Sequence, residues 1–368
     1  MKNTAGSADT GKKERKGHRR AALILIIVLA VLCAGFGAFK AAGRPVDQSS
    51  EKTEIFEVTS GEGASAIGDA LEKAGYIRSG RIFTLQAKLS GHASDIKAGQ
   101  YAVSKSMSTA RIVDMMVSGD TAGHVFTVTE GMSMYKIASM LDKQGICTEK
   151  EFWDAAGKDH SGYRFSKYIP EKNSIYKLEG FLYPDTYEVP LDASAEDVIN
   201  VMLKNFDRHV PEKYYKKASK EGMTVTELVT KASIVQREAA KTKDMPKVAS
   251  VINNRLDKNM YLQMDSILSY IKQEDKVIAS YSDTQIESAY NPYKNKGLPP
   301  GPICSPGIDA IDAALDPADT DYLFFVDSAK LDGTLSFSTN EKDFMKDKAA
   351  FEKAYRKSQK EKSKKNND

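Results

Sequence analysis

Residue types that build reactive centres are scarce in this 368-residue chain, which has three cysteines, five histidines and one tryptophan. The histidines show neither HxxxH nor HxH spacing, and no cysteine joins them into a ligand set, so no metal site is expected. Ser–His and Cys–His arrangements, a P-loop and a GxGxxG motif are also missing, so we expect no cofactor. Cys147 and Cys304 could pair, but two such residues make no disulfide framework.

Positive charge is concentrated at the ends of the chain. The net charge is only +3, and basic residues cluster in residues 1–20 and in the polar C-terminal run RKSQKEKSKKNND. A nucleic-acid-binding protein needs positive charge on a folded segment, so no nucleic-acid partner is expected. We interpret residues 1–20 as a basic tail, and residues 346–368 as the end of a helix followed by a basic, disordered tail.

The one long apolar run, AALILIIVLAVLCAGFGAF at residues 21–39, carries no charge. It is long enough to span a bilayer as a helix. Because the basic residues precede it, the positive-inside rule places residues 1–20 in the cytoplasm and the rest outside. A cleaved signal peptide is the alternative, but the run is long and no clean A-x-A site follows. We therefore predict a single-pass cell-membrane protein whose folded part is extracytoplasmic.

After a polar linker at 40–53, the sequence pattern predicts an α+β protein. Residues 55–77 predict a strand, a glycine turn and a helix, and residues 125–146 repeat this plan about 70 residues later. Residues 96–120 predict a further strand and helix. We divide the chain into a subdomain at 54–122 and a larger mixed α+β domain at 123–345.

The stretch TVTELVTKASIVQREAA, Thr224 to Ala240, predicts an amphipathic helix. Thr224 and Glu227 have capping-box spacing, and an apolar face recurs at Leu228, Ala232, Val235 and Ala239. Glu238 falls on the shoulder of that face, where partial desolvation raises the pKa of a carboxyl and suits it to proton transfer. The alternative is a solvated or salt-bridged glutamate at the helix edge.

The second half of the chain offers further recognisable segments. A second helix is predicted with Asp244 as its cap and Pro246 in its first turn. The proline-rich loop 290–307 reads as a rigid groove wall or a plain linker. Residues 317–340 predict a hairpin with a turn at Asp332-Gly333, followed by a short helix to about Tyr355. The run EGFLYPDTYE, with its aromatics and carboxylates, suits either a sugar ring or a packed turn.

Five segments together resemble one family in order and rough spacing: LEGFLYPDTYEV, ASIVQRE, VASVINNRLDKNMYLQMDS, SAYNPYKNKGLPPGPICSPG and LFFV…FSTN. The chain is thus similar, from about residue 50 to about residue 345, to the YceG-like (MltG) endolytic murein transglycosylases. The resemblance implies a lytic transglycosylase that cleaves the MurNAc-β-1,4-GlcNAc bond within glycan strands and leaves a 1,6-anhydro-MurNAc end. It also implies that the front strand–helix units, at 54–122, are a LysM-like subdomain, and that residues 123–345 are the YceG-like catalytic domain, which would lie outside the cytoplasm.

The resemblance assigns the essential glutamate of the family to Glu238, the last residue of ASIVQRE. Two positions depart from the family pattern: Gln236 replaces an acidic residue, and Ser266 stands where many relatives have proline. On a helix Gln236 points away from Glu238, so we expect its replacement to leave the catalytic acid alone. Candidates for the substrate groove are Glu179, Tyr183, Asp185, Tyr187, Asn254, Gln263, Asp265, Tyr290, Asn291 and Asn340.

A single glutamate suffices for this chemistry, because the substrate's own C6 hydroxyl attacks and no second carboxylate has to activate water. The implied partners are peptidoglycan glycan strands, peptidoglycan synthases (penicillin-binding proteins) and division or elongation proteins, and the implied role is termination of nascent strand elongation. Three alternatives stay open at this stage. The chain could be a wall-binding scaffold without activity, Glu179 could be the acid, or the enzyme could be a muramidase that uses water.

Overall fold

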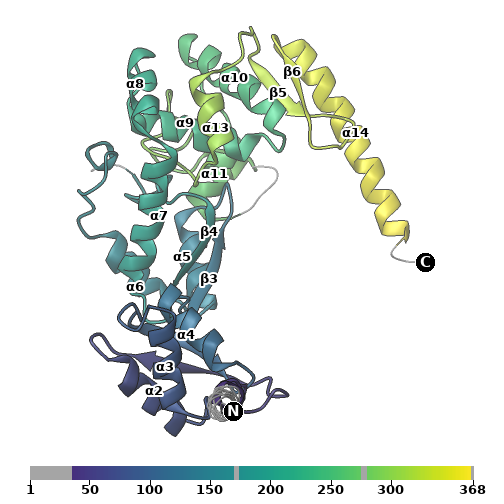
Figure 1. The fold of residues 1–368 in the computed structure, drawn as a ribbon. Helices are drawn as coiled ribbons and strands as arrows, with labels where there is room; N and C mark the ends of the chain where they lie inside the picture. Colours follow the sequence, from purple (N-terminus) through teal and green to yellow (C-terminus); the bar gives the residue numbers. More distant parts are fainter. Residues whose placement is uncertain (1–34, 170–173, 275–279, 366–368) are drawn as a thin grey trace, which may run out of the picture. The chain divides into compact units, whose positions relative to one another are not determined.

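A computed structural model describes residues 35–169, 174–274 and 280–365 (Figure 1). The chain forms two compact units, one ending at Gly123 and the other beginning at His124. The predicted membrane span at 21–39 overlaps the described residues only at 35–39. Among the described helices, none combines the length and the apolarity that crossing a membrane requires. The α+β prediction is confirmed, because small sheets and helices alternate along both units.

Two strands and three helices fold together in the described part of the first unit, and residues 35–42 before them are also helical. Strands β1 (Thr53–Val58) and β2 (Gly99–Ser104) pair antiparallel, and helices α2 (Ala64–Lys73) and α3 (Gly80–Leu89) connect them. Helix α4 (Thr109–Ser118) follows. Helices α2 and α3 cross with their backbones in contact, since a Cβ on Gly68 would lie 2.7 Å from the Gly80 carbonyl oxygen. The core of this unit consists mainly of Ile67, Leu71, Phe83, Tyr101, Val103, Ile112 and Met116.

The second unit carries the remaining elements, and its strands form two separate two-stranded sheets, β3 with β4 and β5 with β6. Its strands are β3 (Gly123–Val128), β4 (Asp185–Pro190), β5 (Phe324–Asp327) and β6 (Leu335–Ser338). Its helices are α5 (Met134–Lys143), α6 (Glu149–Ala156), α7 (Ala195–His209), α8 (Glu212–Lys220), α9 (Val225–Glu238), α10 (Met245–Asp257), α11 (Asp265–Lys272), α12 (Tyr281–Thr284), α13 (Ile308–Leu315) and α14 (Glu341–Lys365). The single-turn segments η1 (Ser166–Tyr168) and η2 (Thr242–Asp244) complete the described elements.

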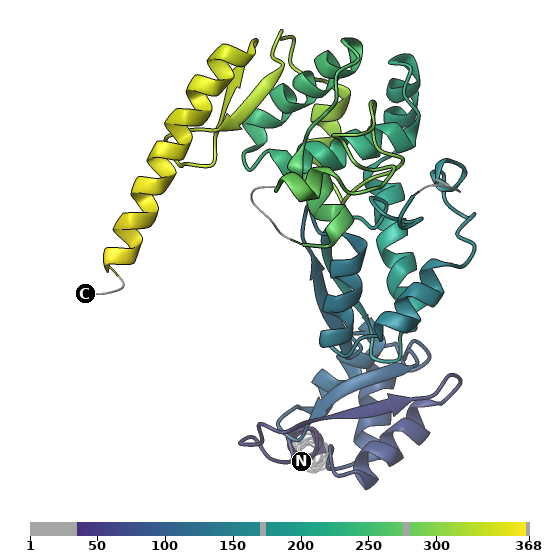
Figure 2. The ribbon, with the colours of Figure 1, turned by 180° about the vertical axis from the view of Figure 1, so that it is seen from behind.

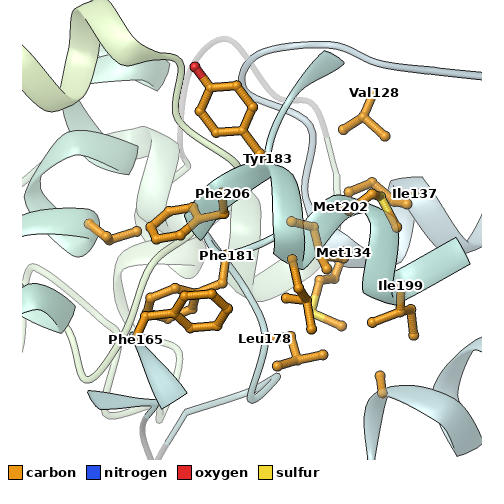
Figure 3. Packing of buried hydrophobic residues seen from close by; sticks show 14 of the residues in the cluster. Val128, Met134, Ile137, Phe165, Leu178, Phe181, Tyr183, Ile199, Met202 and Phe206 are labelled. Carbon is orange, nitrogen blue, oxygen red and sulfur yellow. The ribbon is translucent and has the colours of Figure 1, made fainter. Parts of the chain in front are cut away.

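An aromatic cluster forms the centre of the larger core (Figure 3). The rings of Phe165 and Phe181 stack with centroids 5.0 Å apart, and Phe206 from α7 packs against both. Tyr183 and Tyr187 belong to the same buried cluster. The aromatic side chains of EGFLYPDTYE are therefore core residues, which is the packed-turn alternative considered for that run.

A second apolar cluster lies under the end of α9 and positions the site described below. It joins the last turn of α9 to α10, α11 and α13 through Ile234, Val235, Val248, Ile267 and Ala310, and Ile303 of the proline-rich loop completes it. Because these helices share one core, the C-terminal end of α9 and the N-terminal end of α11 are held close together.

Several local predictions can be compared directly with the structure. Strands β5 and β6 form the predicted antiparallel hairpin, with Phe325 opposite Phe337. Asp244 stands at the N-cap position of α10 as predicted, but its side chain makes no capping hydrogen bond. Its carboxylate instead accepts a 3.1 Å hydrogen bond from the backbone N–H of Leu335. Helix α14, which packs against β5 and β6, continues to Lys365 (Figures 1 and 2). The predicted end near Tyr355 is wrong because the following Lys, Gln and Glu residues are good helix formers without a Gly or Pro stop.

Candidate active site

Helix α9 begins and ends at well-defined positions, and its last residue is Glu238. Thr224 and Glu227 form the predicted capping box, with Thr224 Oγ1 accepting from the Glu227 N–H at 3.2 Å. On the apolar face of the helix, Leu228, Ala232 and Val235 are fully buried. Ala239 leaves the helix in an extended conformation, with φ −107° and ψ 107°. The Glu238 side chain therefore projects at the point where the chain turns away from the helix.

The carboxylate of Glu238 faces the first turn of α11. Ser266 Oγ donates a 2.5 Å hydrogen bond to Glu238 Oε1, and the Ser266 backbone N–H also stabilises the carboxylate. Protein surrounds the carboxylate group, yet the residue as a whole keeps part of its surface open to solvent. The position thus combines desolvation with access for a ligand, as a general acid requires.

The pKa of Glu238 is raised above its usual range, as expected from its place on the helix shoulder. Burial is the main cause, and the nearby carboxylate of Asp265 adds to it. The hydrogen bonds from Ser266 and the charge of Arg237 act in the opposite direction. The net effect shifts the carboxyl towards its protonated form, which is the form that can give a proton to a leaving group.

Asp265 and Tyr293 form a second polar pair beside Glu238. Tyr293 Oη donates a 2.6 Å hydrogen bond to Asp265 Oδ1. Burial raises the pKa of Tyr293, and the charges of Asp265 and Glu238 raise it further. Two carboxyl groups and a phenol that stays protonated therefore meet at the start of α11, and hydroxyl groups of a sugar can pair with such donors and acceptors.

The proline-rich loop lies along α9 and is no plain linker. The backbone N–H of Ile303 donates to Ser233 Oγ at 3.0 Å, and that of Gly307 donates to Gln236 Oε1 at 3.0 Å. Residues 301–307 are all buried. Gly180 permits this close approach, because a Cβ there would lie 2.6 Å from Pro302.

Gln236 lies on the side of α9 away from the Glu238 carboxylate. Its Oε1 accepts from Gly307, and its Nε2 reaches Glu130 Oε2 at 3.5 Å. The Arg237 guanidinium donates to the Gly131 carbonyl oxygen at 3.3 Å. Gln236, which replaces the acidic residue of the family motif, therefore contacts the turn after β3. It takes no part in the hydrogen bond between Ser266 and Glu238.

Of the groove candidates, Asp265 lies beside Glu238 and affects the pKa of that carboxyl directly. Gln263 stands two residues before Asp265 in an exposed position with φ +49°. The backbone N–H of Gln263 donates to the Pro292 carbonyl oxygen at 3.2 Å, which joins this segment to the loop that carries Tyr293.

Glu179 is completely buried in the turn before β4. Its carboxylate accepts from the backbone N–H of Met134, the first residue of α5, at 3.1 Å to each oxygen. Burial raises the pKa of Glu179 to about 8, although these hydrogen bonds act against the shift. The side chain has no surface that a substrate could reach in this conformation.

Tyr183, Asp185 and Tyr187 form one group around Asn205 of α7. Asn205 Nδ2 donates to Asp185 Oδ2 at 2.8 Å and to Tyr187 Oη at 3.1 Å. The Tyr183 ring stacks on His209 with centroids 4.3 Å apart. These contacts connect β4 to α7, and the two tyrosines are buried.

Three of the four remaining candidates organise the backbone, and the fourth is a core residue. Asn254 Nδ2 donates to the carbonyl oxygens of Thr320 and Tyr322, at 2.7 and 2.9 Å. The fully buried Asn291 holds the turns on either side of it, and Asn340 caps α14 through the Asp343 N–H at 3.0 Å. Tyr290 is buried against Tyr270.

Three residues of the site region were not among the predicted groove candidates: Ser266, Tyr293 and Arg255. Arg255 is buried, donates to the Leu323 carbonyl oxygen at 2.7 Å and lies over the Phe324 ring. Ser266 had appeared only as a departure from proline, yet the hydroxyl that proline lacks is the group that binds Glu238. Sequence spacing gives no signal for Tyr293, which reaches Asp265 from a different loop.

Within the described ranges, no three His, Cys, Asp or Glu side chains are grouped as a metal site. Cys147 and Cys304 are both free and buried. The Cys304 thiol donates to the Ser233 carbonyl oxygen at 3.3 Å, and burial raises its pKa well above the usual range. The open question of their pairing is thereby answered: the two thiols do not form a disulfide.

Comparison with known proteins gives consistent matches. The profile of the YceG-like family matches residues 56–350. An endolytic murein transglycosylase of Bacillus subtilis is 36% identical over 331 residues, covering 86% of this chain and 90% of that protein. One from Streptococcus pneumoniae is 33% identical over 360 residues and covers 89% of this chain, which spans 64% of the pneumococcal protein. The crystal structure of a yceG-like protein from Listeria monocytogenes matches with a TM-score of 0.55 at 32% identity, covering 81% of this chain and 99% of the other.

Proposed function

This chain belongs to the YceG-like family, and from that premise we propose that it is an endolytic lytic transglycosylase with Glu238 as its catalytic acid and base. Its substrate is the glycan strand of peptidoglycan, and the bond cleaved is MurNAc-β-1,4-GlcNAc. The observation that carries the residue assignment is the environment of Glu238: a desolvated carboxyl with a raised pKa that remains partly open to solvent.

The mechanism needs one carboxyl group that acts twice. Protonated Glu238 gives its proton to the glycosidic oxygen as the bond to the MurNAc anomeric carbon breaks. The resulting carboxylate takes the proton from the C6 hydroxyl of the same sugar, whose oxygen attacks the anomeric carbon and closes the 1,6-anhydro ring. Because the nucleophile is part of the substrate, the reaction needs no second carboxylate and consumes no water. Ser266 keeps Glu238 Oε1 in place during both proton transfers.

The alternative acid, Glu179, is disfavoured by its position. Its carboxylate is closed off from solvent beneath the N-terminus of α5, whereas Glu238 keeps part of its surface open to solvent. A scaffold without activity is disfavoured by the relatives, which are named as enzymes. A muramidase differs from a transglycosylase only in its product end, so the product decides between them.

The finer parts of this proposal concern location and partners. A peptidoglycan-cleaving enzyme works outside the cytoplasm, and residues 21–39 would anchor it in the membrane with residues 1–20 inside. The β1–α2–α3–β2 unit would serve as a LysM-like module that holds glycan. Such an anchored enzyme is placed to cut strands as penicillin-binding synthases extend them, and so to terminate their elongation together with division or elongation proteins.

The test is a digest of purified glycan strands by the full chain, with products identified by mass spectrometry. We expect wild type to release fragments one water lighter than hydrolysis products, and Glu238→Gln to release none while keeping the wild-type Tm. Glu188→Gln, which changes an exposed glutamate of β4, is the matched control and should cleave normally. Fragments with reducing ends would indicate a muramidase instead, and cleavage by Glu238→Gln would exclude Glu238 as the acid.

A further inference from the structure

A hollow of about 450 Å³ lies in the second unit and plays no part in the chemistry described above. It is lined by Tyr135, Ser139, Glu149, Trp153, Tyr176 and Gln273. These residues come from α5, α6, the segment before β4 and the C-terminal end of α11. Three of the six are aromatic, and Trp153 is the only tryptophan in the chain.

The aromatic wall of this hollow is ordered by its own contacts. The rings of Trp153 and Tyr176 stack with centroids 4.6 Å apart and planes 23° from parallel. Phe152 supports Trp153 from the core side in an edge-to-face contact at 5.2 Å. Gln273 donates to the Tyr176 hydroxyl. Trp153, Tyr176 and Tyr135 all remain partly exposed, so aromatic surface is held rigidly and is open to a ligand.

One face of α11 connects this hollow to the catalytic carboxyl. Ser266, Ser269, Tyr270 and Gln273 follow one another at i, i+3, i+4 and i+7, which places them along one side of the helix. Ser266, Ser269 and Tyr270 also line a small depression, together with Tyr135 and Arg237. Tyr135 also lines the hollow itself. Seven residues of helix separate Ser266, the partner of Glu238, from Gln273 by about 10 Å.

We propose that this hollow, the Trp153 subsite, binds a sugar residue of the same glycan strand at a distance from the bond that is cleaved. This inference rests on the proposed function, and it assigns a place where the enzyme contacts the substrate away from the cleaved bond. A pyranose ring has an apolar CH face that packs on aromatic rings, and a polar rim that pairs with amide, hydroxyl and carboxylate groups. Trp153 and Tyr176 supply the first kind of surface, and Gln273, Ser139 and Glu149 supply the second.

A remote subsite has a consequence for the reaction. A strand that contacts both Glu238 and the Trp153 subsite is bound at an internal stretch and not at an end. This binding favours cleavage inside the strand. Short fragments that reach only Glu238 lose this contact. The subsite therefore predicts a preference for long substrates that depends on Trp153, Tyr176 and Gln273.

The single tryptophan permits a direct binding measurement in full-length Glu238→Gln protein, which retains the strand without cutting it. Peptide-free glycan strands should shift or quench the tryptophan emission in a saturable manner, and a disaccharide fragment should do so only at far higher concentration. Tyr355→Ala, which removes an exposed tyrosine on α14, should leave the titration unchanged. A tryptophan signal that does not respond to glycan strands would overturn the subsite.

The second measurement is the kinetics of cleavage in the background with intact Glu238. Tyr176→Ala and Gln273→Ala should each raise KM for long strands about fivefold, while kcat and the rate on short fragments stay near wild type. Gln273 is exposed, so its variant tests the subsite without disturbing the core. Unchanged KM in both variants would contradict the proposal. Strand binding at Trp153 by a wild-type protein that does not cleave would support the subsite and reject the transglycosylase assignment, so the two failures are distinguishable.

Discussion

Ser266 and Glu238 are joined by a 2.5 Å hydrogen bond from Ser266 Oγ to Glu238 Oε1. The bond connects the last residue of α9 to the second residue of α11, two helices that share one apolar core. It stabilises the ionised form of Glu238, whereas burial and Asp265 favour the protonated form. The pKa of Glu238 is therefore set by opposing effects. Removing the Ser266 hydroxyl or the Asp265 charge should move this pKa in a known direction.

Ser266→Ala removes a donor that lowers the pKa of Glu238. The proton is required for the first step, so activity is lost as pH rises through this pKa. We expect the alkaline limb of the kcat/KM profile to move up by about one pH unit, because a hydrogen bond to a charged group is worth roughly that much. Ser282→Ala, which changes an exposed serine of α12, is the control. An unmoved limb would mean that the hydroxyl does not tune the acid.

Asp265→Asn should have the opposite effect. The Asp265 carboxylate raises the pKa of Glu238, and its loss lets Glu238 ionise more easily. The alkaline limb should then move down by about half a pH unit to one unit. The amide oxygen can still accept from Tyr293, so the local fold is kept. Asp321→Asn, an exposed position, should leave the profile unchanged, and an upward shift with Asp265→Asn would contradict the electrostatic account.

Glu179→Gln tests the buried carboxyl through stability. Burial raises the pKa of Glu179 from 4.5 to about 8, so between these values the unfolded chain ionises while the folded chain stays protonated. Wild type therefore loses stability as pH rises from about 4.5 to about 8, and Gln does not titrate. We expect the stability of the variant relative to wild type to increase over this window by at least the ~1.4 kcal/mol that one pKa unit represents.

The same variant also tests the identity of the acid. Glutamine can still accept from the Met134 N–H, so the turn before β4 should be preserved. Strand cleavage by Glu179→Gln should therefore remain within a factor of a few of wild type. Loss of cleavage with an unchanged Tm would return Glu179 to the role of catalytic acid.

Gln236→Glu restores the acidic residue of the family motif and should destabilise this chain. The new carboxylate would face Glu130, to which Gln236 now donates at 3.5 Å. We expect a loss of about 1 kcal/mol at neutral pH, which Glu130→Gln should reverse in the double variant. Urea unfolding of the four proteins gives the coupling energy, and additive effects would show that the two side chains do not interact.

Much of the local structure follows from the sequence because local rules decide it. The capping box at Thr224, the hairpin at Asp332-Gly333 and the apolar face of α9 all formed as expected. Asp244 takes the N-cap position of α10 as expected, but its carboxylate binds the N–H of Leu335 on β6, a partner that no local rule could anticipate. The aromatic EGFLYPDTYE run was ambiguous for the same reason, since burial depends on what the rest of the chain places against it.

The sequence by itself determined the family resemblance, the candidacy of Glu238 and the direction of its pKa shift, because helix periodicity fixes which side of α9 the carboxyl occupies. Only the tertiary structure decided what surrounds that carboxyl. Ser266 and Asp265 reach it from α11, Tyr293 of the proline-rich loop binds Asp265 in turn, and Glu179 is withdrawn beneath the N-terminus of α5. Access, desolvation and hydrogen bonding depend on packing between distant segments, and sequence spacing carries no record of those distances.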